Sequence, residues 1–344
     1  MSILFLMREH ADYFPIDKRI KKIYLDSFDT PYYRTAEKLK KKSILRGKLN
    51  NAVFYAYDLG CFFVLKDWIK NNHQQYDQII TCWYKLSTYL TFTDAASKTI
   101  AWEHINHKTG GLVFFKLLRS RYRHLNRVIC LTSEAMDYYQ EKEVDVSKIT
   151  NIIGDQYENE KFDFDKKENL ILLASRLDPE KNVKGFLEII SEINLPSEWS
   201  IAVAGDGRES GFLKTYAEDL GIKRIKFLGS VASEQMIEMF RKSKIYCMTS
   251  LVEGLPTTLI EAMFCGNTLI SYDCPTGPSE IINKNNGFLI PLHDKEKFKE
   301  KLTLVLNDPA LLKKISTSSY EESLKWKKGV IINQWISLLE NVAH

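Results

Sequence analysis

The chain has 344 residues, a length typical of two domains. Hydrophobic residues make up 44% and charged residues 27%, which are globular values and exclude a disordered, collagenous or fibrous chain. The sequence has no apolar run near the ~20 residues that a membrane helix needs. Residues 1–7 have neither a basic leader nor a small-residue cleavage site, so we interpret them as a first strand and not as a signal peptide.

The cysteines indicate the compartment. The sequence has six of them, without a CxxC pair or regular spacing. In a chain of this size without an export signal, this pattern is typical of reduced, mostly buried thiols. We therefore expect a cytoplasmic protein.

The charge is unevenly distributed along the chain. The formal net charge is +4, but residues 1–155 carry 24 Lys and Arg against 17 Asp and Glu, and the remainder carries 24 against 27. A basic first half beside a mildly acidic second half indicates a surface that meets an anionic partner, such as phosphate headgroups. A solvated lysine-rich face remains the alternative. Nucleic acid has little support, because the basic residues lie outside any recognisable binding motif.

The first half of the chain mixes helical and strand patterns. Leu112–His124 is interpreted as a basic amphipathic helix, and Ser133–Lys142 as a helix with Ser133 at its N-cap. The other expected helices are 36–48 and 54–70, and the expected strands are 20–25, 78–83, 99–103 and 128–132.

The second half alternates strands with helices of 10–15 residues, which predicts βαβ units and a doubly wound parallel sheet. The expected strands are 169–174, 199–204, 225–228, 245–249 and 268–272, and the expected helices are 183–193, 211–220, 233–243 and 257–264. A helical stretch from about 319 to 339 carries Trp326 and Trp335.

The polar segment 154–167 reads as a linker. We therefore predict three parts: residues 1–155 as an N-terminal domain, 156–318 as a C-terminal domain, and 319–344 as a C-terminal helix.

The segment EGLPTTLIEAM carries the strongest chemical pattern, with Glu253 and Glu261 eight positions apart. Glu253 follows a predicted strand, at the sheet edge where open α/β folds bind ligands. Gly254 lets a ligand approach the backbone. Pro256 suits a helix start, and Thr257 and Thr258 fall in a first turn whose free amides suit a phosphate. The alternative without a function is that Glu253 caps a loop and Glu261 is a solvated helix residue.

Two cations follow the first strand of the second half. Arg176 and Lys181 lie five residues apart on one loop, at the same predicted sheet edge as Glu253. Such a pair can clamp a diphosphate and stabilise its departure without a metal. Two solvated cations are the alternative. Gly205, Gly207 and Gly229 end two further strands, where they allow either tight turns or a close approach of the backbone to a nucleotide.

Together these segments resemble the donor-binding half of retaining GT-B glycosyltransferases of family four, over residues 169–290. SRLDPEKN, AGDG, FLG, EGLPTTLIEAM and DCPTGPSEII occur in the order and spacing of that family. The resemblance implies two Rossmann-like domains facing a cleft. It implies that residues 1–155 bind the acceptor, that residues 156–318 bind the nucleotide-sugar donor, and that the helix in 319–344 crosses back to the N-terminal domain. It implies that Arg176 and Lys181 hold the donor diphosphate, Glu261 the ribose and Glu253 the transferred sugar. It also implies that Gly254 and Leu255 present amides to that sugar, and that no cofactor or divalent metal is needed.

The first half resembles the family less closely. Residues 15–25 look like an element that normally follows two strands, so the N-terminal domain is expected to lack its first βα unit. The resemblance places His104 near the sugar, with a core histidine as the alternative and His107 as a competitor. Lys116, Arg119, Arg121 and Arg123 either touch a diphosphate-lipid acceptor or membrane face, or form a solvated helix end.

The sequence therefore predicts transfer of a hexose or N-acetylhexosamine, with retention, from a UDP-sugar to a lipid-linked or free glycan acceptor. The form of DCPTGPSE resembles bacterial enzymes of capsule, O-antigen or other surface-polysaccharide synthesis, at the inner face of the membrane. A non-catalytic sugar-nucleotide-binding partner of an active transferase is the main alternative. An epimerase or a phosphorylase is a further one.

Overall fold

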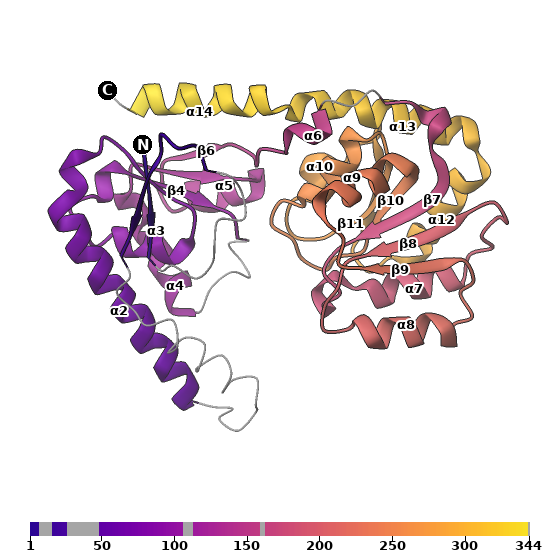
Figure 1. Ribbon diagram of the computed structural model, residues 1–344, viewed down its shortest axis with the longest axis horizontal. Coiled ribbons are helices and arrows are strands. Elements are labelled where there is room, and N and C mark those ends of the chain that lie inside the picture. Colours follow the sequence, from indigo (N-terminus) through magenta and orange to yellow (C-terminus); the bar gives the residue numbers. More distant parts are fainter. Residues whose placement is uncertain (7–15, 26–47, 106–112, 159–161, 343–344) are drawn as a thin grey trace. The chain divides into compact units, whose positions relative to one another are not determined.

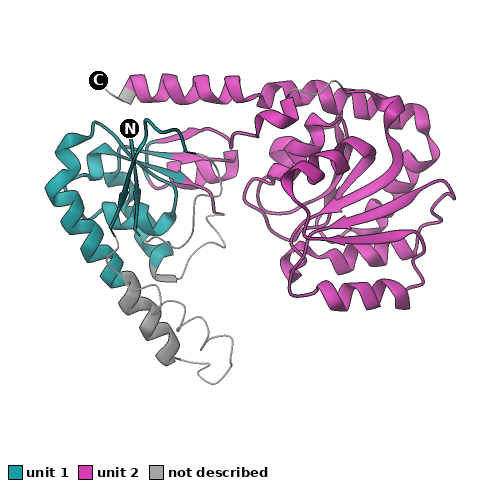
Figure 2. Cartoon of the chain, viewed as in Figure 1, with its two compact units in different colours: residues 1–102, 111–128, 143–145 teal, residues 103–110, 129–142, 146–344 magenta. Residues whose placement is uncertain are grey.

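The computed structural model describes residues 1–6, 16–25, 48–105, 113–158 and 162–342 (Figure 1). The chain divides into two compact units (Figure 2). The first comprises residues 1–102, 111–128 and 143–145, and the second comprises 103–110, 129–142 and 146–344. The expected helix 36–48 and His107 lie outside the described residues, apart from Lys48.

The described residues within 1–148 form two separate sheets. Strands β1 (Ser2–Phe5) and β2 (Lys21–Tyr24) pair in parallel as a two-stranded sheet. A four-stranded sheet has the order β3 (Ile79–Thr81), β4 (Thr99–Glu103), β5 (Arg127–Cys130) and β6 (Val146–Lys148). The helices are α2 (Lys48–Asn72), α3 (Tyr84–Leu90), α4 (Val113–Leu118) and α5 (Ser133–Gln140), with 3₁₀ turns at 73–75, 96–98 and 119–124.

The core of the first unit forms where α2 packs against α3 and α4. Leu65 and Ile69 of α2 form a buried cluster with Leu90 of α3 and Phe115 of α4. Leu4 of β1 packs against this cluster. Leu65 and Ile69 are four residues apart, so they share one face of the helix.

Two details of this region differ from expectation. The stretch predicted as one helix over 112–124 is the short α4 followed by a 3₁₀ turn over 119–124. The N-cap of α5 is Thr132 and not Ser133, because the Thr132 hydroxyl accepts the Ala135 amide at 3.3 Å. Ser133 is already the first helical residue.

The second unit is built on a six-stranded sheet with the order β12-β11-β10-β7-β8-β9, in which all neighbouring strands pair in parallel (Figure 1). The strands are β7 (Glu168–Ala174), β8 (Ser200–Ala204), β9 (Ile225–Gly229), β10 (Ser243–Met248), β11 (Thr268–Asp273) and β12 (Gly287–Pro291). Its longer helices are α7 (Val183–Ser191), α8 (Ser210–Asp219), α9 (Ser233–Lys242), α10 (Thr257–Phe264), α12 (Lys295–Asn307), α13 (Pro309–Ser323) and α14 (Lys328–Val342). Short helices are α6 (Asp155–Glu158) and α11 (Pro278–Ile281), with 3₁₀ turns at 164–166, 179–181 and 324–326.

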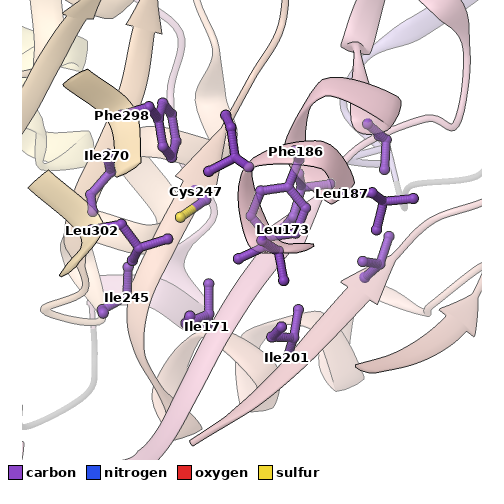
Figure 3. Close-up of a cluster of buried hydrophobic side chains, with 14 of the residues drawn as sticks. Ile171, Leu173, Phe186, Leu187, Ile201, Ile245, Cys247, Ile270, Phe298 and Leu302 are labelled. Atoms are coloured by element: carbon purple, nitrogen blue, oxygen red, sulfur yellow. The ribbon is translucent and has the colours of Figure 1, made fainter. Parts of the chain in front are cut away.

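Alternate residues of the central strands point to opposite faces of this sheet. Ile171 and Leu173 of β7 join Ile245 of β10 in one core, which is closed by Phe186 of α7 and Phe298 of α12 (Figure 3). Leu172 and Tyr246, one position away, are equally buried on the other face. Strands buried on both faces are continuous apolar runs, which is why the sequence predicts them well.

The C-terminal stretch is organised differently from the prediction. Instead of one helical stretch over 319–339, α13 starts at Pro309 and ends at Ser323, and α14 starts at Lys328. Lys327 has an extended ψ of 142°, which interrupts the helix. All of 146–344 belongs to the second unit, and the predicted crossing of the last helix stays a prediction.

The strand order changes direction between β7 and β10. The chain runs from β7 outward through β8 to β9, and then returns to β10 on the other side of β7. The loops that follow β7 and β10 therefore diverge from adjacent strands. In open α/β sheets this switch point is where ligands bind.

Candidate functional site

The loops after β7 and β10 are tied together by main-chain and hydroxyl hydrogen bonds. The Leu251 amide donates to the Glu180 carbonyl at 2.8 Å. The Thr249 hydroxyl donates to the carbonyls of Lys181 and Asn182, at 3.3 and 3.0 Å. These bonds place the two sequence-predicted clusters beside each other at the carboxyl edge of the sheet.

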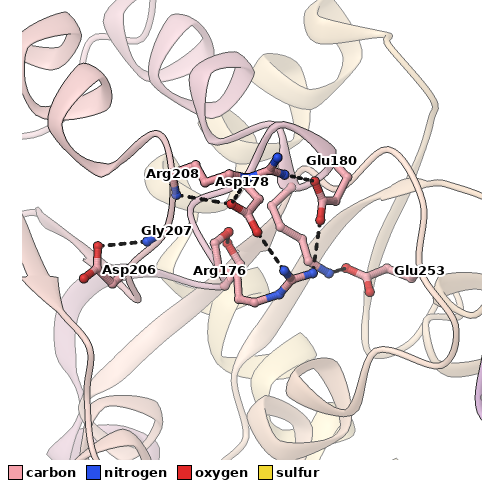
Figure 4. A network of polar contacts seen from close by, with 9 residues as sticks. Arg176, Asp178, Glu180, Asp206, Gly207, Arg208 and Glu253 are labelled. Atoms are coloured by element: carbon pink, nitrogen blue, oxygen red, sulfur yellow. Dashed lines mark hydrogen bonds and ion pairs between the residues drawn. The ribbon is translucent and has the colours of Figure 1, made fainter. Parts of the chain in front are cut away.

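An ion pair joins those clusters directly. The Lys181 ammonium lies 2.6 Å from the Glu253 carboxylate, with only 16% and 13% of the side chains exposed (Figure 4). A sheltered pair has less competition from water than a surface pair. The cation expected at the diphosphate and the carboxylate expected at the sugar therefore touch at the switch point.

Arg176 belongs to a closed ring of ion pairs. Its guanidinium contacts Asp178 at 2.7 Å and Glu180 at 3.0 Å (Figure 4). Arg208 contacts the same two carboxylates, at 3.0 and 3.7 Å. The hydrogen bond from Arg208 is the main cause that lowers the pKa of Asp178, against the effect of burial. The sequence did not predict a role for Asp178, Glu180 or Arg208. Asp178 and Glu180 nevertheless lie inside the SRLDPEKN segment.

The glycine turn after β8 packs against the Arg176 loop. A Cβ on Gly205, whose φ is +124°, would stand 1.8 Å from the Ser175 carbonyl oxygen, and one on Gly207 would lie 2.6 Å from the Leu177 carbonyl. Only glycine fits such an approach. The Gly205 amide also donates to the Gly229 carbonyl at 2.7 Å. The three glycines thus lie at the same sheet edge as Arg176.

The Glu253 loop is held by the segment that follows β11. The Thr276 hydroxyl donates to the carbonyls of Glu253 and Gly254, at 3.1 and 3.0 Å. The Glu253 amide donates in turn to the Pro275 carbonyl at 2.9 Å. Thr276 is buried, so these bonds are shielded from water. The hydroxyl fixes the loop on which Gly254 and Leu255 follow Glu253.

Helix α10 begins where the sequence predicted. Pro256 precedes it, Thr257 and Thr258 form its first turn, and Leu255 is buried before it. Thr258 shares a hydrogen bond with Tyr246, whose hydroxyl donates to the Ala174 carbonyl at 3.0 Å. The Thr258 side chain therefore contacts Tyr246 of the sheet, and its predicted role in donor binding stays a prediction.

Glu261 has a partner that the sequence did not indicate. The Tyr157 hydroxyl of α6 donates to its carboxylate at 3.3 Å. Burial raises the pKa of Glu261, and the hydrogen bond from Tyr157 opposes that shift. Tyr157 is itself buried, and the loss of hydration raises its pKa. No sequence signal marks it, because it lies 104 residues away in a polar segment.

His104, also in the second unit, follows β4. A Cβ on Gly254 would lie 3.0 Å from its main-chain oxygen, so the glycine permits this close approach. Both residues line a small cavity with Glu103 and Thr276. Loss of hydration lowers the pKa of the His104 imidazole, and a hydrogen bond with Asn151 opposes the shift.

Arg119 differs from the surface role expected for it. It is fully buried in the first unit, with its guanidinium 5.7 Å from the Tyr84 ring centroid. Arg121 stacks over Phe92 at 4.0 Å and donates to the Thr91 carbonyl at 3.1 Å. Of the four basic side chains expected on this surface, Arg119 is therefore excluded.

Within the described residues, no group of three or more His, Cys, Asp or Glu side chains could hold a metal. The metal-free prediction stays a prediction. All six cysteines are free thiols, and all but Cys82 are buried. Among the described helices, none is long and apolar enough to cross a bilayer.

Comparisons with known proteins show the fold and the enzymes that this chain resembles. A lipopolysaccharide outer core galactosyltransferase, WaaB, superposes with a TM-score of 0.71 at 19% identity, over 94% of this chain and 85% of that one. Anabaena HepE, in complex with UDP-glucose, superposes with a TM-score of 0.69 at 16% identity, over 81% of this chain and 82% of that one. The chain thus has the GT-B fold, with two Rossmann-like domains.

Residues 155–322, a little under half of the chain, match the family described as glycosyl transferases group 1, and this similarity supports a transferase enzyme. A *Campylobacter jejuni* relative is 27% identical over 98% of this chain and 90% of its own length. It is an α-1,4-N-acetyl-D-galactosaminyltransferase that acts on a GalNAc-containing glycan linked to diphospho-undecaprenol.

Proposed function

We propose that the chain is a retaining transferase that moves a hexose or N-acetylhexosamine from a UDP-sugar to a lipid-linked glycan of the cell surface. The observation that carries the proposal is the Lys181–Glu253 pair beside Arg176 at the switch point of a sheet within the region that matches the group 1 transferases. The *Campylobacter* relative's lipid-linked acceptor and the UDP-glucose bound to HepE support the two substrate classes.

The donor diphosphate binds to Arg176, Lys181 and the first amides of α10. A guanidinium and an ammonium on one loop can neutralise both phosphates, and helix amides add further donors. Glu261 accepts hydrogen bonds from the ribose hydroxyls. Gly205, Gly207 and Gly229 form the backbone that borders the nucleotide. No metal or other cofactor is required in this scheme.

Glu253 contacts the transferred sugar, with the Gly254 and Leu255 amides beside it and His104 near the same sugar. The bond between the anomeric carbon and the diphosphate oxygen breaks, and its electron pair leaves on the diphosphate. Lys181, which touches both Glu253 and the diphosphate in this scheme, stabilises that charge. The acceptor hydroxyl then bonds to the anomeric carbon from the same face, and its proton passes to the oxygen of the departing diphosphate.

We assign the proposed membrane contact to an exposed apolar patch in the first unit, called here the aromatic patch. It is formed by Leu59, Phe62, Phe63 and Phe92. Leu59, Phe63 and Phe92 are 55%, 58% and 41% exposed. Phe62 packs against Phe63 and Phe92 at ring distances of 5.3 and 6.2 Å. The cations Lys66 and Arg121 lie over Phe62 and Phe92, at 5.7 and 4.0 Å.

Exposed aromatic rings beside cations suit an anionic membrane surface, where rings enter the headgroup layer and cations meet phosphates. A lipid-linked acceptor requires access to that surface. The patch is therefore the part of the chain that we assign to peripheral contact with the inner face of the membrane.

The proposal is tested by a binding and turnover screen of the whole chain. UDP-, GDP- and ADP-sugars are compared by thermal shift, and UDP release is measured with and without a lipid-diphosphate sugar acceptor. A ligand that binds the folded state raises the melting temperature. A shift with one UDP-sugar and acceptor-dependent release of UDP are expected.

Binding without release on any acceptor would instead favour a non-catalytic partner of an active transferase. Conversion of free donor without acceptor would point to an epimerase, and dependence on inorganic phosphate to a phosphorylase. A stabilising effect confined to GDP- or ADP-sugars would contradict the donor class.

A further inference from the structure

The ring formed by Arg176, Asp178, Glu180 and Arg208 adds a residue to the donor site. Arg208 follows the glycine turn after β8, and the sequence did not predict a role for its charge. The inference rests on the proposed function, because it concerns the same diphosphate.

The backbone brings Arg208 to Arg176. The Leu177 amide donates to the Asp206 carbonyl, and the Glu209 amide donates to the Leu177 carbonyl, both at 2.9 Å. Since β7 and β8 are neighbouring parallel strands, their following loops leave the same edge of the sheet. The position of Arg208 is therefore fixed by main-chain bonds, and not only by its flexible side chain.

The ring has an inner and an outer side. The Asp178 side chain is 9% exposed, whereas those of Arg176 and Arg208 are 67% and 75% exposed. The Asp178 carboxylate accepts both the main-chain amide and the Nε of Arg208, at 3.2 and 3.0 Å. The acidic group thus lies beneath the two guanidiniums, and an approaching anion meets the guanidiniums first.

A guanidinium has five N–H donors. Arg208 uses Nε toward Asp178 and Nη2 toward Glu180, so a phosphate can be bound without breaking either contact. The contact with Asp178 also raises the pKa of Arg208, which keeps it charged. Two guanidiniums held side by side match the two phosphates of a nucleoside diphosphate.

We propose that Arg208 binds the donor diphosphate together with Arg176, and that Asp178 and Glu180 hold the two guanidiniums in place. Asp178 and Glu180 are positioning residues in this arrangement. The pair prefers a diphosphate to a monophosphate, because the second phosphate adds negative charge and further acceptor oxygens for the two guanidiniums.

The experiment compares Arg208→Ala, Arg208→Lys and the control Lys223→Ala in the full chain, by calorimetric titration with UDP and with UMP. Lys223 is exposed and lies just before β9, at the opposite edge of the sheet, so it matches the charge change without the position. Melting temperatures establish that each variant is folded.

Arg208→Ala is expected to weaken UDP binding about tenfold to a hundredfold, as loss of charge-assisted hydrogen bonds does, and UMP binding by a smaller factor. Arg208→Lys keeps the charge but loses the planar set of guanidinium donors. Its UDP affinity should lie between those of Arg208→Ala and the parent. Lys223→Ala should bind as the parent does. Asp178→Asn, which leaves both arginines in the chain, should also weaken UDP binding.

The outcomes separate the two proposals. If Arg208→Ala binds UDP within twofold of the parent while Arg176→Ala does not, the role of Arg208 is overturned and the donor site stands. Equal losses for UDP and UMP would overturn the assignment to the diphosphate. If the parent chain binds no nucleoside diphosphate at all, the proposed function itself fails.

Discussion

The sheet edge of the second unit and the aromatic patch of the first unit expose their side chains in opposite ways. At the sheet edge, Arg176, Lys181 and Glu253 come from loops tied by main-chain hydrogen bonds, and each of these side chains has a partner of opposite charge. In the patch, Phe63 and Phe92 leave apolar rings in water. The first arrangement suits chemistry that needs fixed geometry, and the second suits a deformable partner such as a lipid surface.

The largest effect is expected at Glu253. Glu253→Gln should lower kcat by about 10²–10³-fold, as removal of a transition-state contact does, while UDP still binds. Loss of the carboxylate leaves Lys181 free for the diphosphate, so UDP affinity should be equal to or above that of the parent. Turnover and calorimetry measure the two effects, with Glu238→Gln on the exposed face of α9 as the control. Turnover of Glu253→Gln near that of the control would refute the assignment.

Lys181 should affect binding itself. Lys181→Ala removes a cation from the diphosphate and leaves the sheltered Glu253 without its partner, so UDP affinity should fall about tenfold to a hundredfold. Arg176→Ala should weaken UDP binding by a factor in the same range. The matched control is Lys184→Ala, an exposed lysine of α7. UDP titrations that show no difference between Lys181→Ala and this control would break the proposed clamp.

Thr276 tests whether the tie on the Glu253 loop matters. Thr276→Val removes the hydroxyl that donates to the Glu253 and Gly254 carbonyls but keeps the branched shape. A loosened loop should lower kcat/KM about tenfold, since small displacements of reacting groups cost rate. Thr276→Ser restores the hydroxyl and should recover most of the activity. If Thr276→Ser is as impaired as Thr276→Val, packing and not the hydroxyl is responsible.

Tyr157 gives a pH-dependent effect. Glu261 accepts hydrogen bonds from ribose hydroxyls best when ionised, so donor affinity should fall as pH drops through its pKa, which burial raises above the ordinary range of a glutamate. The Tyr157 hydroxyl opposes that shift. Tyr157→Phe should therefore move the acidic limb of donor binding to higher pH and weaken the donor several-fold. Calorimetry across the acidic range measures this, and an unmoved limb would contradict it.

The smallest effect is expected in the patch. Phe63→Ser should lower binding to vesicles of mixed neutral and anionic lipid about threefold, because the rest of the patch remains and partial burial of one ring contributes about 0.7 kcal/mol. Turnover on a short, water-soluble acceptor should not change. The control is Phe212→Ser, another exposed ring, located on α8 of the second unit. Equal vesicle binding of the two variants would argue against the patch.

The sequence predicted what depends on local pattern. The strands β7 to β11 are apolar runs, and α10 follows Pro256, so both were found close to their observed bounds. The pairing of Asp178 with Arg208 could not be predicted, because it depends on β7 and β8 being neighbours and on glycine backbones in contact. Arg119 shows the converse limit. Its place among Arg121 and Arg123 suggested a basic surface, yet it is buried beside an aromatic ring.

The charge balance at the sheet edge bears on how fast a donor arrives. Arg176, Arg208 and Lys181 face Asp178, Glu180 and Glu253, so this set of six side chains sums to zero. A neutral set produces little field beyond a Debye length, about 8 Å at physiological ionic strength. The association rate constant for a nucleotide sugar should therefore change little with added salt, even where its dissociation is salt-sensitive.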